Sequence, residues 1–174
     1  NTGGTVVGAY GGVPFPIPKT GNEAMWNHVL RWRGEAALFP FRSYVVGADG
    51  KPALASEATN DFNMPWHFQD GSPEKSTGEF WATMQVVTAP SFKAGEILMI
   101  RDQIDVDKGR AAWQYLVGQR RVRRFPTLGY DTPNPVNSGA DLVDQAFLFN
   151  GYQDRYDWKL VGKKEMYVPY NMNG

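Results

Sequence analysis

The sequence predicts a mainly β domain with few helices, of the α+β class. Segments rich in Val, Ile, Phe, Met and Trp follow one another and are separated by short turns that contain Gly and Asp. Aromatic residues make up 14% of the chain, and aromatic side chains favour strands. With 174 residues, one domain spanning residues 1–174 is expected. Because the sequence starts at Asn1, we also expect that it lost a leader or belongs to a longer protein.

One helix is predicted after a loop-like opening that contains Pro14, Pro16 and Pro18. Thr20 and Glu23 have the spacing of a capping box. Apolar residues then recur at spacings of three, four and seven, which places them on one helical face. These residues are Met25, Trp26, Val29, Leu30 and Trp32.

The remaining elements are predicted to be mostly strands of a meander. Turn signals such as Asp70-Gly71 and Asp107-Lys-Gly109 separate them. The expected strands are Phe41–Val46, Trp66–Phe68, Glu79–Thr88, Glu96–Asp107, Ala112–Leu116, Arg120–Phe125, Trp158–Val161 and Met166–Val168. Between the sixth and seventh strands we expect a long loop, Pro126–Gly139, and a short helix within Ser138–Phe149.

Composition and charge exclude several classes of function. The 18 basic and 18 acidic residues cancel, so the molecule as a whole does not attract nucleic acid. No cysteine is present, which excludes disulfides, cysteine-based zinc sites and thiol nucleophiles. No apolar run is long enough to span a membrane, so we expect a protein that is peripheral to a membrane at most.

The sequence marks no catalytic or metal-binding constellation. Only two histidines occur, His28 and His67, and neither belongs to a nucleophile or metal-ligand motif. Asp102, Asp105 and Asp107 do not form a calcium loop. A pair of carboxylates for glycoside chemistry stays open, because such a pair meets in space and not along the chain. We therefore expect no enzyme, no metal and no cofactor.

A basic strip, Gln119–Arg124, has two interpretations. Four arginines suit an acidic headgroup or an acidic partner. Alternatively, they charge an edge strand against unwanted pairing, or they pair with the acids Asp102, Asp105 and Asp107 on the neighbouring strand. The second interpretation is favoured.

Large aromatic residues are expected on both faces of the sheet. Neighbours such as Phe80 and Trp81 point to opposite faces of a strand. The predicted helix can cover one face, so the other requires more protein, a partner or an apolar ligand.

Long segments of the chain resemble a known group of proteins. The strand pair Trp113–Pro126 resembles that of outer-membrane lipoprotein-sorting proteins, the LolA/LolB type. Gly12–Pro18, Gly129–Pro135 and Arg155–Tyr170 are similar to an uncharacterised proteobacterial family with a domain of unknown function. The resemblance implies export to the periplasm and a curved antiparallel sheet, an incomplete β-barrel with helices inside. In the carriers, the apolar space between sheet and helices holds acyl chains.

The preferred hypothesis is a periplasmic, non-catalytic binding domain for a lipid, a lipoprotein acyl chain or another apolar molecule. Trp81, Trp113 and Tyr115 are expected to line the concave face, although a shift of one residue would reverse their facing. Met25, Trp26 and Leu30 would form a lid, and Arg121 and Arg123 would meet an anionic head. The alternatives are an interaction module for envelope or transport proteins and a carbohydrate-binding sandwich.

Overall fold

The computed structural model describes residues 6–170. In chain order the elements are α1 (Gly21–Val29), β1 (Ala36–Val46), β2 (Pro52–Asn63), η1 (Pro65–His67), β3 (Glu79–Ala89), β4 (Ile97–Gln103), β5 (Ala111–Leu116), β6 (Arg121–Arg124) and η2 (Val143–Leu148). No helix in this part of the chain is long and apolar enough to cross a membrane.

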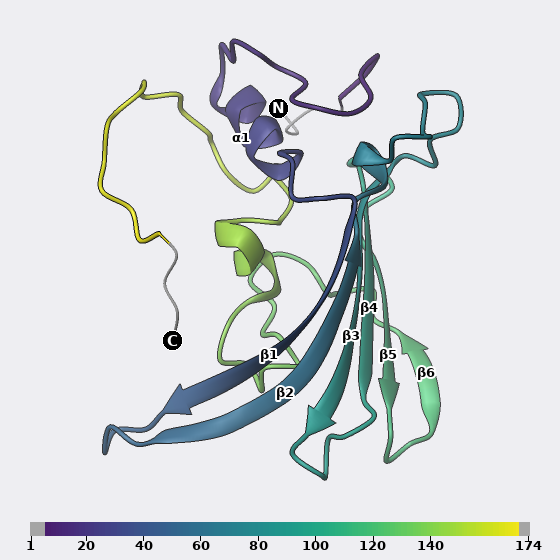
Figure 1. Ribbon diagram of the computed structural model, residues 1–174, viewed down its shortest axis with the longest axis vertical. Coiled ribbons are helices and arrows are strands. Elements are labelled where there is room, and N and C mark those ends of the chain that lie inside the picture. Colours follow the sequence, from purple (N-terminus) through teal and green to yellow (C-terminus); the bar gives the residue numbers. More distant parts are fainter. Residues whose placement is uncertain (1–5, 171–174) are drawn as a thin grey trace.

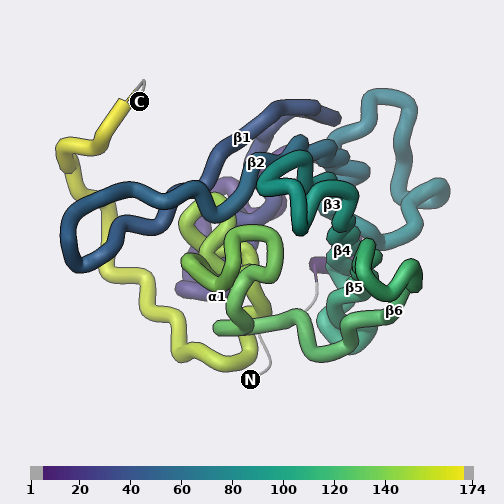
Figure 2. The backbone as a smooth tube through the Cα atoms, turned by 90° about the horizontal axis from the view of Figure 1, so that it is seen from below, coloured from purple at the N-terminus to yellow at the C-terminus, as the bar shows by residue number. Residues whose placement is uncertain are grey.

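The six strands form one antiparallel meander in the order of the sequence, as the turn signals predict. The sheet is strongly curved, and the chain that follows β6 lies on its concave side (Figures 1 and 2). The sheet is open, with β1 and β6 at its two edges. The predicted mainly β, α+β class is therefore confirmed at the level of a curved antiparallel sheet with few helices.

One long strand, β2, is absent from the sequence prediction, and one predicted strand is wrong. β2 contains small and polar residues, of which Ser56, Ala58 and Asn60 alternate on its buried face. Residues of this kind have low strand propensity, so pairing with β1 and β3 decides the conformation. The segment expected as a strand at Trp66–Phe68 instead forms the 3₁₀ turn η1, because Pro65 occupies its first position.

The core lies on the concave side of the sheet. Cross-strand partners share a face, and Phe62, Thr83 and Ile100 form one such buried row. The hydroxyls of Ser43 and Ser56 both donate to the Asn137 side chain, which fastens the chain after β6 to this face. It is thus the chain between residues 126 and 150, and not α1, that covers the concave side.

The predicted helix is confirmed, but it is shorter than the apolar pattern. The Thr20 side chain accepts a hydrogen bond from the Glu23 N–H at 3.2 Å, as the capping box predicts. The Glu23 carboxylate accepts from the Lys19 N–H. The helix ends at Val29, so Trp32 lies outside it and is 63% exposed, in contrast to the prediction.

After β6, one prediction is confirmed in part and two are wrong. The short helix expected within Ser138–Phe149 is present only as the 3₁₀ element η2, because Phe147 and Leu148 adopt positive φ of 55° and 77°, which no α-helix permits. The segments expected as strands at Trp158–Val161 and Met166–Val168 form no strand, because no described segment pairs with them. The loop expected at Pro126–Gly139 is present.

Candidate functional site

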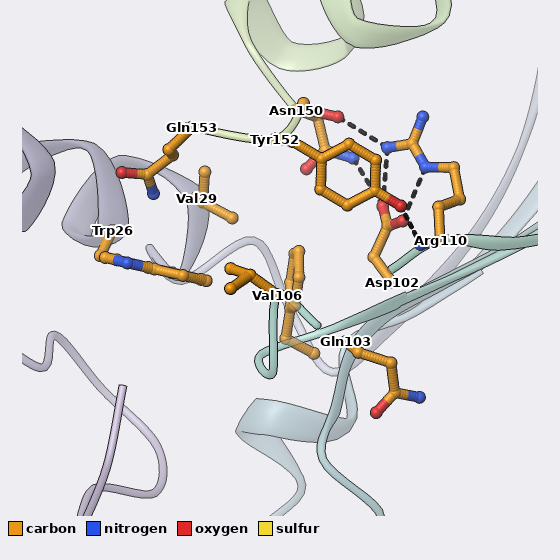
Figure 3. A pocket seen from close by; sticks show the side chains of 11 residues that line it. Trp26, Val29, Asp102, Gln103, Val106, Arg110, Asn150, Tyr152 and Gln153 are labelled. Atoms are coloured by element: carbon orange, nitrogen blue, oxygen red, sulfur yellow. Dashed lines mark hydrogen bonds and ion pairs between the residues drawn. The ribbon is translucent and has the colours of Figure 1, made fainter. Parts of the chain in front are cut away.

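A hollow lies between α1, the adjoining ends of β3 and β4, and the segment after η2 (Figure 3). Its cavity volume is about 30 Å³. This is far below the ~300–1,000 Å³ of typical small-molecule sites and is room for about one water molecule. Its lining consists of Trp26, Val29, Phe80, Asp102, Gln103, Val106, Arg110, Asn150, Gly151, Tyr152 and Gln153.

One wall of the hollow is apolar. Trp26 of α1 meets Phe80 of β3 edge to face, with ring centroids 6.4 Å apart. Val29 is one turn further along the same face of α1, and Val106 comes from the turn between β4 and β5. The spacing of three between Trp26 and Val29 that predicts the helix therefore also builds this wall.

The opposite wall is a buried ion pair. Arg110 Nε donates to Asp102 Oδ1 at 2.7 Å, and Arg110 Nη2 donates to Asp102 Oδ2 at 2.9 Å. Their side chains are only 4% and 7% exposed. Arg110 Nη2 also donates to the Asn150 carbonyl, and the Tyr152 hydroxyl accepts from the Arg110 N–H (Figure 3). These bonds hold the segment after η2 against the sheet.

The surroundings fix the protonation of this wall. Burial alone lowers the pKa of Arg110, but the attraction and hydrogen bonds of Asp102 outweigh it and raise the pKa above its usual value. Burial, together with the negative charge of Asp102, raises the pKa of Tyr152 to about 12. Arg110 is thus charged and Tyr152 is a neutral phenol near neutral pH. Neither group is suited to take up a proton from a substrate.

Four side chains of the hollow carry polar atoms without a hydrogen-bond partner in the described part of the chain. They are the acceptors Gln103 Oε1 and Asn150 Oδ1 and the donors Arg110 Nη1 and Gln153 Nε2. Asn150 and Gln153 are 2% and 3% exposed, and both line the hollow. Gln103 differs, because its side chain points away from the others (Figure 3). Unpaired buried polar atoms are costly, so a bound molecule that pairs with them would be stabilised.

The three residues of the predicted lid take different positions. Trp26 lines the hollow as expected for a residue near a ligand. Leu30 is fully buried and is absent from the lining. Met25 is half-buried and is also absent from the lining. Only Trp26 therefore contributes to the candidate site.

The prediction that Trp81, Trp113 and Tyr115 share the concave face is wrong. Trp81 is buried on that face, where its ring lies 6.4 Å from the ring of Phe147. In β5 it is Ala112 that pairs with the buried Ile100, so Trp113 and Tyr115 point to the opposite face. The strand pairing differs by one residue from the pairing that the prediction requires, and this places Trp113 and Tyr115 outside the core.

Arg121 and Arg123 do not reach the hollow, which corrects their expected role toward a ligand held there. Both lie on β6, at an edge of the sheet, and are exposed. Arg123 donates to the side chain of Gln114 at 2.9 Å. The expected pairing of the strip with Asp102 is also wrong, because Asp102 pairs with Arg110.

The functional residues that the sequence analysis missed are the polar ones. On sequence alone, Asp102 is considered for a calcium loop and as a partner of the basic strip, although Asp102 alternates with Leu98 and Ile100 on one strand face. A single charged residue among buried apolar positions requires a partner of opposite charge. From this pattern, Arg110, which follows the next turn, could have been predicted as the partner of Asp102. Asn150 and Gln153 carry no comparable signal in the sequence.

Both histidines have structural partners. The Nε2 atoms of His28 and His67 lie 3.2 and 3.0 Å from the carbonyl oxygens of Phe149 and Leu30. Burial, reinforced by nearby arginines, lowers the pKa of each histidine. Within residues 6–170, no three His, Asp or Glu side chains are placed to hold a metal ion.

The chain is similar to proteins whose function is not established. It is 40% identical over 159 residues to an uncharacterised protein of Pseudomonas aeruginosa, PA3922; the match covers 91% of this chain and 35% of that protein. The chain thus spans about a third of the length of this relative. No solved structure matches it. The model of the family described as "protein of unknown function (DUF1329)" matches residues 1–174, so the chain belongs to this family.

Proposed function

We propose that this member of the DUF1329 family is a non-enzymatic binding domain that binds a small, largely apolar ligand at the hollow beside α1, with a group of a few atoms inside it. One observation carries the proposal: an apolar wall and unpaired polar atoms meet in one hollow. Trp26 and Phe80 would contact the apolar body of the ligand. Asn150 Oδ1 and Gln153 Nε2 would pair with a polar group that both donates and accepts, such as a hydroxyl, an amide or a carboxylic acid.

The size of the space favours a small ligand over an entire acyl chain. In a lipoprotein carrier the concave side would hold acyl chains. Here the chain between residues 126 and 150 lies on that side, where Phe147 packs against Phe62 and Trp81. The remaining hollow is confined to one end of the sheet. A ligand that places only a small group in the hollow therefore fits better than a long lipid tail.

The setting is part of the same proposal. A curved antiparallel sheet with chain packed into its concave side supports the resemblance to the LolA/LolB type of fold and, through it, a periplasmic location. Because the chain spans about a third of its relative, carrier activity would belong to the longer protein as a whole.

The test is to extract protein purified from a periplasmic fraction with organic solvent and to analyse the extract by mass spectrometry. A stoichiometric apolar compound is expected from the wild type. In the variant Val106→Trp the larger side chain fills the hollow, so the compound should be absent. The control is Val46→Trp, since Val46 ends β1, is 66% exposed and does not line the hollow.

A clean extract from folded wild-type protein would count against ligand binding and in favour of a protein-interaction role. A compound that co-purifies equally with all three proteins would place its site elsewhere. Circular dichroism confirms that each variant is folded.

A further inference from the structure

The convex face of the sheet carries two apolar rows that cross β3 to β6. Cross-strand pairing joins the side chains within each row, and both rows point away from the core. The first row is Met84, Met99 and Trp113, and it ends at Arg124. The second row is Val86, Ile97, Tyr115 and Val122.

These rows are not part of the hydrophobic core. None of their apolar residues belongs to the core cluster or to the side chains packed against it. Val122 is 68% exposed, and Val117, in the turn before β6, is also exposed. A sheet face that meets only water is usually polar, so this face is suited to a contact with something apolar.

Four arginines, Arg120, Arg121, Arg123 and Arg124, lie on or beside β6 at this edge of the sheet. Arg124 ends the first row on the convex face, whereas Arg121 and Arg123 pair with Leu116 and Gln114 and point to the concave face. All four are exposed, and no carboxylate of the described residues lies within 4.0 Å of their guanidinium groups. Arg42, Arg101, Arg110 and Arg155 are paired with acids, whereas Arg31 and Arg33 donate to the His28 carbonyl. In a chain of zero net charge, four exposed arginines without an acid partner therefore gather at one edge of the sheet.

A charged edge strand that discourages pairing would explain the arginines. It would not explain the apolar rows beside them. Exposed aliphatic side chains, partly exposed Trp and Tyr, and a rim of arginines together match a bilayer interface with anionic headgroups.

We propose that the corner formed by β5, β6 and their turn docks on the surface of an anionic lipid membrane. Val117 and Val122 enter the headgroup region, Trp113 and Tyr115 lie at the interface, and Arg120 in the turn and Arg124 on the convex face contact lipid phosphates. This contact is peripheral and does not depend on a ligand in the hollow, because the hollow has a separate lining.

The test is co-sedimentation with vesicles made of equal parts phosphatidylglycerol and phosphatidylcholine, compared with vesicles of phosphatidylcholine alone. The wild type should bind the anionic vesicles and release them as salt is raised. A basic residue near such a surface strengthens binding roughly fivefold, so Arg120→Gln/Arg124→Gln should weaken it roughly 25-fold. Lys163→Gln/Lys164→Gln, which removes equal charge from an exposed segment elsewhere, should leave binding nearly unchanged.

The variant Val122→Ser tests the apolar part of the contact. This variant should also weaken binding to the anionic vesicles. Because Val122 is exposed, the substitution should leave the fold intact, and an unchanged circular dichroism spectrum would show this. Failure of the wild type to bind anionic vesicles would overturn the proposal. So would an equal loss in the lysine control. In a third outcome, only the arginine variant loses binding to the anionic vesicles, and the wild type binds heparin as strongly as it binds the vesicles. The partner of this surface would then be a soluble polyanion and not a membrane.

Discussion

The buried pair Asp102–Arg110 gives the most direct prediction about stability. The variant Asp102→Asn keeps the shape of the side chain but leaves the Arg110 guanidinium, whose side chain is 4% exposed, without its counter-charge. Breaking a buried pair in this way costs about 3–5 kcal/mol. With a urea dependence of about 2 kcal/mol per molar, the unfolding midpoint should fall by about 2 M.

Urea unfolding followed by tryptophan fluorescence measures this loss. The control is Glu79→Gln, which removes the more exposed pair with Arg101 and should cost at most about 1 kcal/mol. The double variant Asp102→Leu/Arg110→Met removes both charges and should recover most of the stability. An Asp102→Asn variant as stable as the Glu79→Gln control would refute the reasoning that this pair holds the polar wall.

Three further predictions concern other parts of the molecule. Lys93→Met removes the buried ammonium that donates to three oxygens of the loop after β6, so it should cost about 3 kcal/mol and speed hydrogen exchange in that loop; unchanged exchange would contradict this. In Gly21→Ala the new Cβ would stand 2.3 Å from the Trp158 carbonyl carbon, so thermal stability should fall, whereas Gly118→Ala, with open space around it, should not change it. Both histidine pKa values are lowered by folding, so stability should be full above about pH 6.5 and decline as the pH is lowered through the window below it. Replacing both histidines with Gln should shrink that decline in the thermal midpoint, and an unchanged profile would assign it to other groups.

The order of the strands could be predicted because it depends on local signals. Asp107-Lys-Gly109 and Val117-Gly-Gln119 lie at turns, and the segments between them are rich in strand-forming residues. β2 could not be predicted in this way, since its small and polar residues become a strand only between two partners. The same dependence on partners explains the error at Trp158–Val161, whose local pattern favours a strand.

The facing of the side chains required the register, which no local pattern contains. The local sequence does not distinguish Trp81 from Trp113 and Tyr115, which are all large aromatic residues on strands. Trp81 is nevertheless buried in the core, whereas Trp113 and Tyr115 lie on the convex face. The wall of the hollow that contains Asp102 and Arg110 could not be predicted from the sequence for a related reason. Asp102 and Arg110 are brought together only by the turn between β4 and β5, and Asn150 reaches them from a segment without regular structure.

The measurement that most directly tests binding in the hollow is native mass spectrometry of the protein purified from a periplasmic fraction. A bound ligand predicts a species heavier than the 19.5 kDa chain by one constant increment, present in the wild type and absent in Val106→Trp. A wild-type spectrum that contains only the bare, folded chain, or an increment that persists in Val106→Trp, would contradict a ligand site beside α1.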